Sequence, residues 1–214
     1  MFAKEGYPFI IFFSILTIFL LFASISLDSL LLAVPAVISV ILTVFVFYFF
    51  RDPERTPPAD GKLILAPADG TVIVAECVPE TPLGGEALKI SIFMSVFNVH
   101  VNRVPFSGRV IDKKYFRGCF LDARDGKASF ENERSVIVLE TAKGVRIAFV
   151  QIAGLIARRI VSYPVIGDDL TRGERYGLIR FGSRVDIYLP ADLKSEVKPG
   201  DLTVSGETVL ARFS

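Results

Sequence analysis

The sequence predicts a mainly β domain, a sandwich or barrel with few short helices, preceded by an N-terminal hydrophobic helical hairpin. Two observations lead to this fold class. Residues 1–50 are almost wholly apolar, and short β-branched and aromatic runs separated by turn residues fill most of the rest. Of the 214 residues, 51% are hydrophobic, which is high for a soluble domain. We therefore expect a membrane-associated hairpin at 1–50, a proline-rich linker at 51–60 and a β domain at 61–214.

The hairpin is expected from two apolar runs that contain no charged residue. They cover residues 9–27 and 30–50, with only Asp28 and Ser29 between them. Each run is about 20 residues long, enough to cross a hydrocarbon core as a helix. The short break predicts antiparallel neighbours. A re-entrant hairpin, which would leave the protein peripheral, stays open as an alternative to a full crossing.

Basic residues flank the hairpin and indicate its orientation. Lys4 precedes it, and Arg51 and Arg55 follow it. Because positive charge favours the cytoplasmic side, we expect the β domain to face the cytoplasm at the cell membrane. The two cysteines, Cys77 and Cys119, form no disulfide framework and fit a reducing compartment.

Charge and composition exclude two classes of function. Lys and Arg total 24 against 23 Asp and Glu, which gives a net charge of +1. A nucleic-acid-binding protein would need a strong basic excess, so no nucleic-acid partner is expected. The single histidine and the absence of metal-ligand cysteine spacing predict no metal site.

The β domain is expected from alternating and β-branched runs. Strands are predicted at 63–66, 71–74, within 88–101, and at 135–140, 145–150, 185–189, 197–201 and 204–210. Residues 67–70 (Pro-Ala-Asp-Gly) make a turn, and residues 141–144 predict a hairpin. The pattern of residues 151–160 does not distinguish a short helix from a loop.

A glycine–serine bond, Gly182–Ser183, precedes the strand at 185–189. Glycine tolerates strained backbone angles and lets a nucleophile approach closely. If the Ser183 hydroxyl attacks the Gly182 carbonyl, the amide becomes an ester, and elimination and hydrolysis leave a pyruvoyl group. A Gly-Ser pair alone is ordinary strand-entry sequence, so the hypothesis needs support from other residues.

Two further residues are candidates for acid–base work. His100 is the only histidine, so any imidazole chemistry runs through it, although a structural histidine is the alternative. Asp69 lies in a turn, where Asp-Gly is common for conformational reasons. A carboxylate near an imidazole can orient it and stabilise its cation. We take Asp69 and His100 as acid–base candidates and leave their division of labour open.

Taken together, these segments resemble phosphatidylserine decarboxylases of the short prokaryotic type. The resemblance covers roughly residues 49–214. The matching stretches are 49–53 (Phe-Phe-Arg-Asp-Pro), 66–70 (Ala-Pro-Ala-Asp-Gly), 93–105, 132–134 (Asn-Glu-Arg), 150–154 with 157–161, and 180–186 (Arg-Phe-Gly-Ser-Arg-Val-Asp).

This resemblance implies a proenzyme that cleaves itself between Gly182 and Ser183. Residues 1–182 would become the β chain and residues 183–214 the α chain, and the two would form a heterodimer. The cofactor would be pyruvate, as a pyruvoyl group derived from Ser183. It would form a Schiff base with the serine amine of a membrane phospholipid, and loss of CO2 would give phosphatidylethanolamine. A higher homo-oligomer is left open.

The chain departs from longer members of that family at two positions. Arg103 stands where they have a second histidine, so the base for Ser183 is open between His100, Asp69 and a water molecule. Arg184 stands where they have threonine. Two alternative functions are an archaeal-type decarboxylase of serine ether lipids and a non-catalytic lipoyl- or biotinyl-like module. The second alternative rests on the turns at 197–201 and 204–207, but no lysine adjoins a methionine as the biotin type needs.

Overall fold

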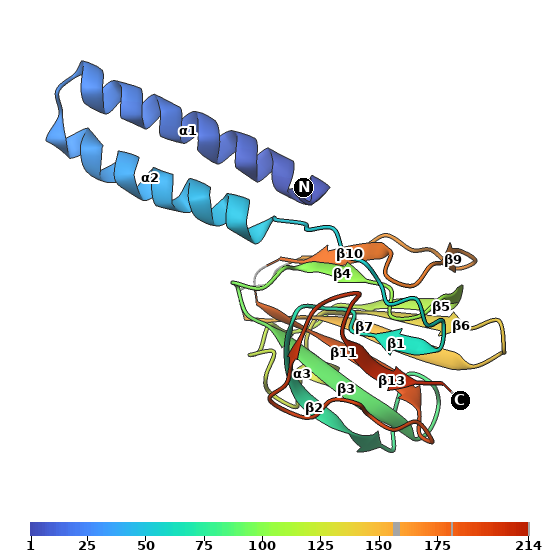
Figure 1. The fold of residues 1–214 in the computed structure, drawn as a ribbon. Coiled ribbons are helices and arrows are strands. Elements are labelled where there is room, and N and C mark those ends of the chain that lie inside the picture. Colours follow the sequence, from blue (N-terminus) through green and yellow to red (C-terminus); the bar gives the residue numbers. More distant parts are fainter. Residues whose placement is uncertain (156–158, 181, 214) are drawn as a thin grey trace. The chain divides into compact units, whose positions relative to one another are not determined.

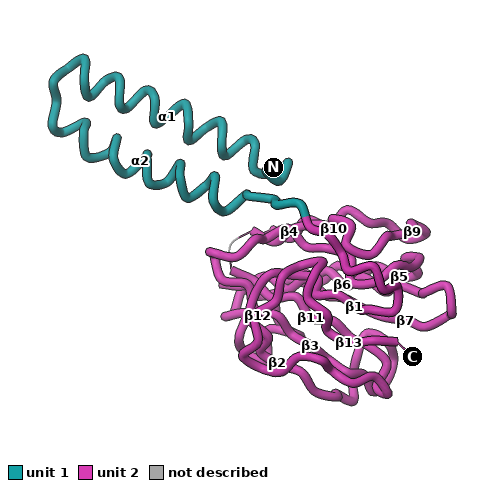
Figure 2. The backbone as a smooth tube through the Cα atoms, viewed as in Figure 1, with its two compact units in different colours: residues 1–54 teal, residues 55–214 magenta. Residues whose placement is uncertain are grey.

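The computed structural model describes residues 1–155, 159–180 and 182–213, and the chain forms two compact units. Unit 1 comprises residues 1–54 and unit 2 residues 55–214 (Figure 2). Unit 1 is helical, and unit 2 consists mainly of strands (Figure 1). The predicted fold class, a β domain with few helices preceded by a hydrophobic helical pair, is confirmed.

Unit 1 is an antiparallel helical hairpin. A 3-10 turn at Lys4–Gly6 leads into α1 (Tyr7–Ser26), which is followed by α2 (Leu30–Phe49). Both helices are long and apolar enough to cross a membrane by length and composition. Between them, the hydroxyls of Thr17 and Thr43 share a 2.8 Å hydrogen bond. Such a polar contact suits two helices in lipid, where apolar packing alone gives little preference for a partner.

The strands in the described part of unit 2 form three antiparallel sheets. The main sheet has eight strands in the order β12–β2–β3–β11–β7–β6–β5–β9 and curls into a half-barrel (Figure 1). Its strands are β2 (Gly70–Val78), β3 (Ala87–Met94), β5 (Gly108–Phe116), β6 (Arg134–Glu140), β7 (Arg146–Ala153), β9 (Asp169–Leu170), β11 (Ser183–Pro190) and β12 (Leu202–Thr203).

The two smaller sheets and one short helix complete the unit. One sheet has the order β4–β10–β8, and the other pairs β1 with β13. Their bounds are β1 (Leu63–Leu65), β4 (Val101–Arg103), β8 (Ile160–Ser162), β10 (Arg175–Ile179) and β13 (Val209–Arg212), and the helix is α3 (Ala128–Glu131).

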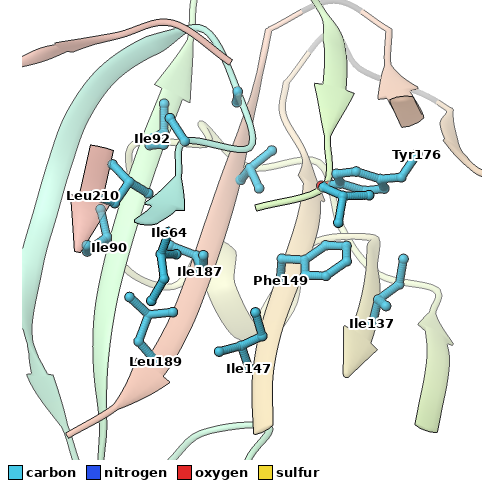
Figure 3. Close-up of a cluster of buried hydrophobic side chains, with 14 of the residues drawn as sticks. Ile64, Ile90, Ile92, Ile137, Ile147, Phe149, Tyr176, Ile187, Leu189 and Leu210 are labelled. Carbon is cyan, nitrogen blue, oxygen red and sulfur yellow. The ribbon is translucent and has the colours of Figure 1, made fainter. Parts of the chain in front are cut away.

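One cluster of buried side chains joins the three sheets (Figure 3). It includes Ile64 of β1, Leu210 of β13 and Tyr176 of β10, together with Phe149 and Ile187 of the main sheet. These side chains lie on the concave face of the main sheet, which we call the inner face. A second buried cluster, which includes Tyr188 and Val150, lies on the opposite, outer face. Because successive side chains of a strand alternate, β11 contributes to both clusters.

Most expected strands are present, but residues 197–201 contain no strand, the expected strand at 204–210 begins only at Val209, and one expected segment is divided. The hairpin at 141–144 is confirmed, with Thr141 N–H donating to the Val145 carbonyl at 2.9 Å. The stretch 88–101 separates into β3 and β4, which belong to different sheets. For the undecided segment 151–160, β7 extends to Ala153 and β8 begins at Ile160, whereas residues 156–158 lie outside the described residues.

Candidate active site at the start of β11

Ser183 is the first residue of β11, near the middle of the main sheet. It pairs with Met94 of β3 on one side and with Ala153 of β7 on the other. Figure 1 shows β11 between these two strands. The residue is fully buried. Its side chain lies on the inner face, because Val185 and Ile187, two and four residues further on, belong to the inner cluster. The serine is therefore held by two neighbouring strands rather than by a surface loop.

Gly182 adopts a backbone conformation that few other residues tolerate. Its φ is +59°, in the left-handed region that favours glycine. Its carbonyl group lies against Gly154, just beyond the end of β7. A Cβ atom built on Gly154 would be 2.2 Å from the Gly182 oxygen and 3.1 Å from its carbon. The missing side chain of Gly154 thus makes the space that the carbonyl of the Gly182–Ser183 bond occupies.

A chain of buried uncharged polar groups leads away from Ser183. Its Oγ lies 3.5 Å from the Met94 sulfur, a weak acceptor. The Asn102 amide nitrogen lies 3.6 Å from the same sulfur, and the Gln151 amide donates to Asn102 at 2.9 Å. Farther along the inner face, against the Phe149 ring, burial raises the pKa of Tyr176 well above its usual 10, so its hydroxyl stays neutral. Met94, Asn102 and Gln151, the groups that lead away from Ser183, carry no charge.

Asp69 and His100 approach the same end of the sheet from two directions. Asp69 precedes β2, which pairs with β3, so two strand spacings of about 10 Å in total separate its backbone from Ser183. Its carboxylate accepts from Arg55 at 2.9 Å and from the Ser205 N–H at 2.8 Å. His100 is buried next to β4, and its Nδ1 lies 2.9 Å from the Asn98 carbonyl oxygen.

Arg103 is buried close to the Asp69 turn. Its N–H donates to the Pro67 carbonyl at 2.9 Å, and its Nη1 donates to the Gly173 carbonyl at 3.0 Å. A guanidinium group stays protonated in proteins and has no acceptor. Arg103 therefore does not replace the second histidine as a base. The candidates for that role remain His100, Asp69 and a water molecule.

The segment before β6 covers the outer side of this site. Asn132 is fully buried, and its amide donates to the carbonyls of Leu121 at 2.9 Å and Ala153 at 2.8 Å. Its oxygen accepts from the Leu121 N–H at 2.9 Å. Because Ala153 pairs with Ser183, Asn132 ties the segment directly to the strand position opposite the serine.

Several residues of this site have no role that the sequence alone predicts. Met94, Asn132 and Gly154 all lie in the stretches that carried the resemblance, but their contacts join segments far apart in the chain. The ion pair of Arg55 with Asp69 was not predicted either.

A cavity of about 600 Å³ lies at the other end of β7, beside Val145 and Phe213, and is not part of this site.

Fold and site together define a β-domain protein that buries a serine behind a left-handed glycine and carries two apolar helices long enough to cross a membrane. Comparison with known proteins gives the family. The sequence model described as phosphatidylserine decarboxylase matches residues 42–211. The chain is 61% identical over 211 residues to the phosphatidylserine decarboxylase proenzyme of Pelobacter propionicus, covering 99% of this chain and 96% of the relative. It is 57% identical over 209 residues to the proenzyme of the same description from Trichlorobacter lovleyi, covering 98% and 95%.

The chain belongs to the phosphatidylserine decarboxylase family, a family of pyruvoyl-dependent enzymes made as proenzymes. Membership confirms the resemblance seen in the sequence. It also sets aside the non-catalytic lipoyl- or biotinyl-like module.

Proposed function

We propose that this chain is the precursor of a membrane-bound decarboxylase that converts phosphatidylserine to phosphatidylethanolamine and CO2. The precursor cuts itself between Gly182 and Ser183. Residues 1–182 and 183–214 then stay together as β and α chains. The observation that carries this proposal is a fully buried serine that follows a left-handed glycine, Gly182, whose carbonyl fits the space left by Gly154.

Self-cleavage needs only groups that the precursor already holds and one water molecule. A bond forms between Ser183 Oγ and the Gly182 carbon as the C–N bond breaks, and the released amine takes a proton. Loss of the Ser183 Cα proton then expels the Gly182 carboxylate from Cβ. Water replaces the nitrogen, which leaves as ammonia, and residue 183 becomes a pyruvoyl group. The left-handed φ of Gly182 supports this route because it turns the carbonyl out of regular strand geometry.

The residues around position 183 fit a small keto group. Met94 and Ala153 hold the position from both sides through the strand ladder, and Met94, Asn102 and Gln151 surround its inner side with uncharged groups. When formed, the pyruvoyl group supplies the electron sink for loss of CO2 from the serine headgroup. The protein must also accept the Oγ proton during cleavage and deliver a proton to the headgroup carbon after CO2 leaves.

We assign these proton transfers to Asp69 and His100, with a water molecule as the remaining candidate for the cleavage step. Both residues lie near the Met94 end of β3, and each is fixed by contacts to the backbone. The chemistry concerns only the headgroup, so an ether-linked serine lipid would suit the same site.

The side of the membrane is also part of the proposal. Lys4, Arg51 and Arg55 favour the cytoplasmic side for unit 2. Cys77 and Cys119 are exposed free thiols and give a direct test. A membrane-impermeant maleimide should label them in broken cells and inverted vesicles but not in intact cells. Labelling in intact cells would place unit 2 outside.

Substitution of Ser183 tests the function. Full-length Ser183→Ala protein in detergent should remain one chain and release no CO2 from vesicles containing phosphatidylserine. The matched control is Ser135→Ala, which removes a buried strand hydroxyl two strands away. The control should be cleaved and active. Cleavage or CO2 release by Ser183→Ala protein would refute the proposal, and parallel vesicles with an ether-linked serine lipid would compare the two substrate classes.

A further inference from the structure

Directly behind the proposed cofactor position, the outer face of β11 carries a group of buried charges. Arg184 and Asp186 alternate with Ser183 and Val185, so their side chains lie on the outer face. The side chains of Arg184 and Asp186 are 1% and 0% exposed. Ser129 of α3 and Lys89 of β3 join them. We call Lys89, Ser129, Arg184 and Asp186 the outer charge cluster.

Asp186 is the centre of this cluster. Its Oδ1 lies 2.8 Å from Arg184 Nε, an ionic contact without the alignment of a hydrogen bond. Its Oδ2 accepts from Ser129 Oγ at 3.0 Å and from Arg184 Nη2 at 3.3 Å, and Lys89 Nζ lies 3.3 Å away. Arg184 Nη2 also donates to Ser129 Oγ. Carboxylate, hydroxyl and guanidinium thus fix one another in a single arrangement.

The other edge of the Arg184 guanidinium reaches the segment that covers the site. Nη1 donates to the carbonyls of Ala123 at 2.9 Å and Asp125 at 3.1 Å. Ala123 also borders the site itself, because a Cβ on Gly154 would lie 3.3 Å from the Ala123 side chain. Arg184, the residue after Ser183, therefore ties β11 to the segment that lies beside the Gly182 carbonyl.

Such a cluster is a costly way to stabilise a strand. Burying an ion pair loses hydration that its attraction barely returns, and apolar residues of similar size often stabilise as well or better. What the cluster does supply is a fixed position. This matters after cleavage, because residue 183 is then a chain end, and chain ends are poorly ordered unless they are tied down.

We propose that the outer charge cluster anchors the new end of the α chain and so positions the pyruvoyl group for decarboxylation. Arg184 and Asp186 are positioning residues, the second and fourth of the α chain. The inference rests on the proposed function. It gives a role to Arg184, the residue at which this chain departs from the threonine of longer family members.

The double variant Arg184→Met/Asp186→Leu tests the anchor. It replaces the pair by apolar side chains of similar length but also removes the partner of Lys89 and the donors to the Ala123 and Asp125 carbonyls, so the melting temperature should fall while the protein still folds and is cleaved. Its kcat for each pyruvoyl group, counted by carbonyl titration, should fall about ten- to hundredfold, because small displacements of a reacting group have large effects. KM should change less than about twofold, since the proposal places neither residue against the substrate.

Hydrogen exchange gives a second measurement that does not depend on activity. The amides of residues 184–186 should exchange faster in the double variant than in the wild type. The matched control is Lys114→Met, which breaks a 2.7 Å ion pair with Asp112 on an exposed part of the same sheet. It should change neither kcat nor exchange at residues 184–186.

Two results would overturn the anchor. One is full kcat for each pyruvoyl group with unchanged exchange, and the other is a folded double variant that is not cleaved, which would place the cluster in processing. If the double variant fails to fold, Arg184→Lys keeps the charge but loses the two-sided guanidinium, and the same two measurements apply. Failure of the proposed function looks different, because the wild type would then lack the cut and the carbonyl group.

Discussion

On the inner face of β11 the Ser183 hydroxyl contacts a thioether, whereas one residue later on the outer face a guanidinium and a carboxylate are buried side by side. Among the residues that the structure describes, the inner side gives the hydroxyl only a weak thioether acceptor, so the hydroxyl stays available to react with its own backbone. The outer side holds the strand by several hydrogen bonds and ionic contacts. Because strand side chains alternate, two adjacent residues separate reactivity from anchoring.

The largest effect should come from Gly154, where the Gly182 carbonyl meets the end of β7. Gly154→Ala would place a methyl group 2.2 Å from the carbonyl oxygen if nothing moved. The carbonyl must therefore shift, and we expect intact precursor without decarboxylase activity. Denaturing gel electrophoresis measures the uncleaved fraction.

The control for this change is Gly61→Ala, since a Cβ there has no neighbour within 4 Å. That variant should be cleaved like the wild type. Normal cleavage of Gly154→Ala protein would show that the carbonyl does not need this space and would remove the main geometric support for the site.

Substitution of the two acid–base candidates should have the next largest effect. It would show which of them acts in cleavage and which in decarboxylation. Asp69→Asn and His100→Gln should each slow cleavage or decarboxylation by about 100-fold, the usual contribution of a positioned acid or base. Cleavage is followed by gel, and decarboxylation by CO2 release for each pyruvoyl group. The step that slows assigns each residue its role.

The exposed carboxylate of Asp112 on β5 provides the control for this pair. Asp112→Asn should leave both rates unchanged. If one of the two candidate variants matched this control in both steps, its residue would have no part in proton transfer.

Asn132 tests how far the outer segment supports the strand. Asn132→Ala removes two donated hydrogen bonds and leaves the Leu121 and Ala153 carbonyls to find other partners. We expect a loss of about 2 kcal/mol in the free energy of unfolding, because unsatisfied buried polar groups are costly. A thermal melt of the detergent-solubilised protein measures it, and an unchanged melting temperature would contradict the role of Asn132 as a tie.

The smallest effect should come from Met94, the thioether opposite Ser183. Met94→Leu conserves volume and removes only a weak acceptor, so its stability cost should stay below about 1.5 kcal/mol. Cleavage should proceed within a few-fold of the wild-type rate in a time course of precursor loss. A complete block would mean that the sulfur takes part in the reaction and that the inner side is not a passive surface.

The hairpin was predictable because its signal is local. Two uncharged runs separated by Asp28 and Ser29 are enough to place α1 and α2 within a few residues. The predicted hairpin at 141–144 has the same origin. In contrast, β3 and β4 belong to different sheets because each pairs with strands far away in the sequence. Strand β5 was not predicted, and its bulge between Val110 and Asp112 breaks the alternation of its side chains.

The candidate site likewise has residues that the sequence predicts and residues that only the fold reveals. Gly182, Ser183, Asp69 and His100 stood out by residue type and by resemblance. The fit of Gly154 to the Gly182 carbonyl and the contact of Arg184 with Ser129 depend on segments that only the folded chain brings together. No local pattern reports such contacts.

The mass of the purified wild-type protein under denaturing conditions decides whether the chain cuts itself between Gly182 and Ser183. We predict two fragments, residues 1–182 and 183–214. The smaller should be lighter by one ammonia than a chain that begins with serine and should react with a carbonyl reagent. A single chain of 214 residues with full decarboxylase activity, or a cut at another bond, would contradict it.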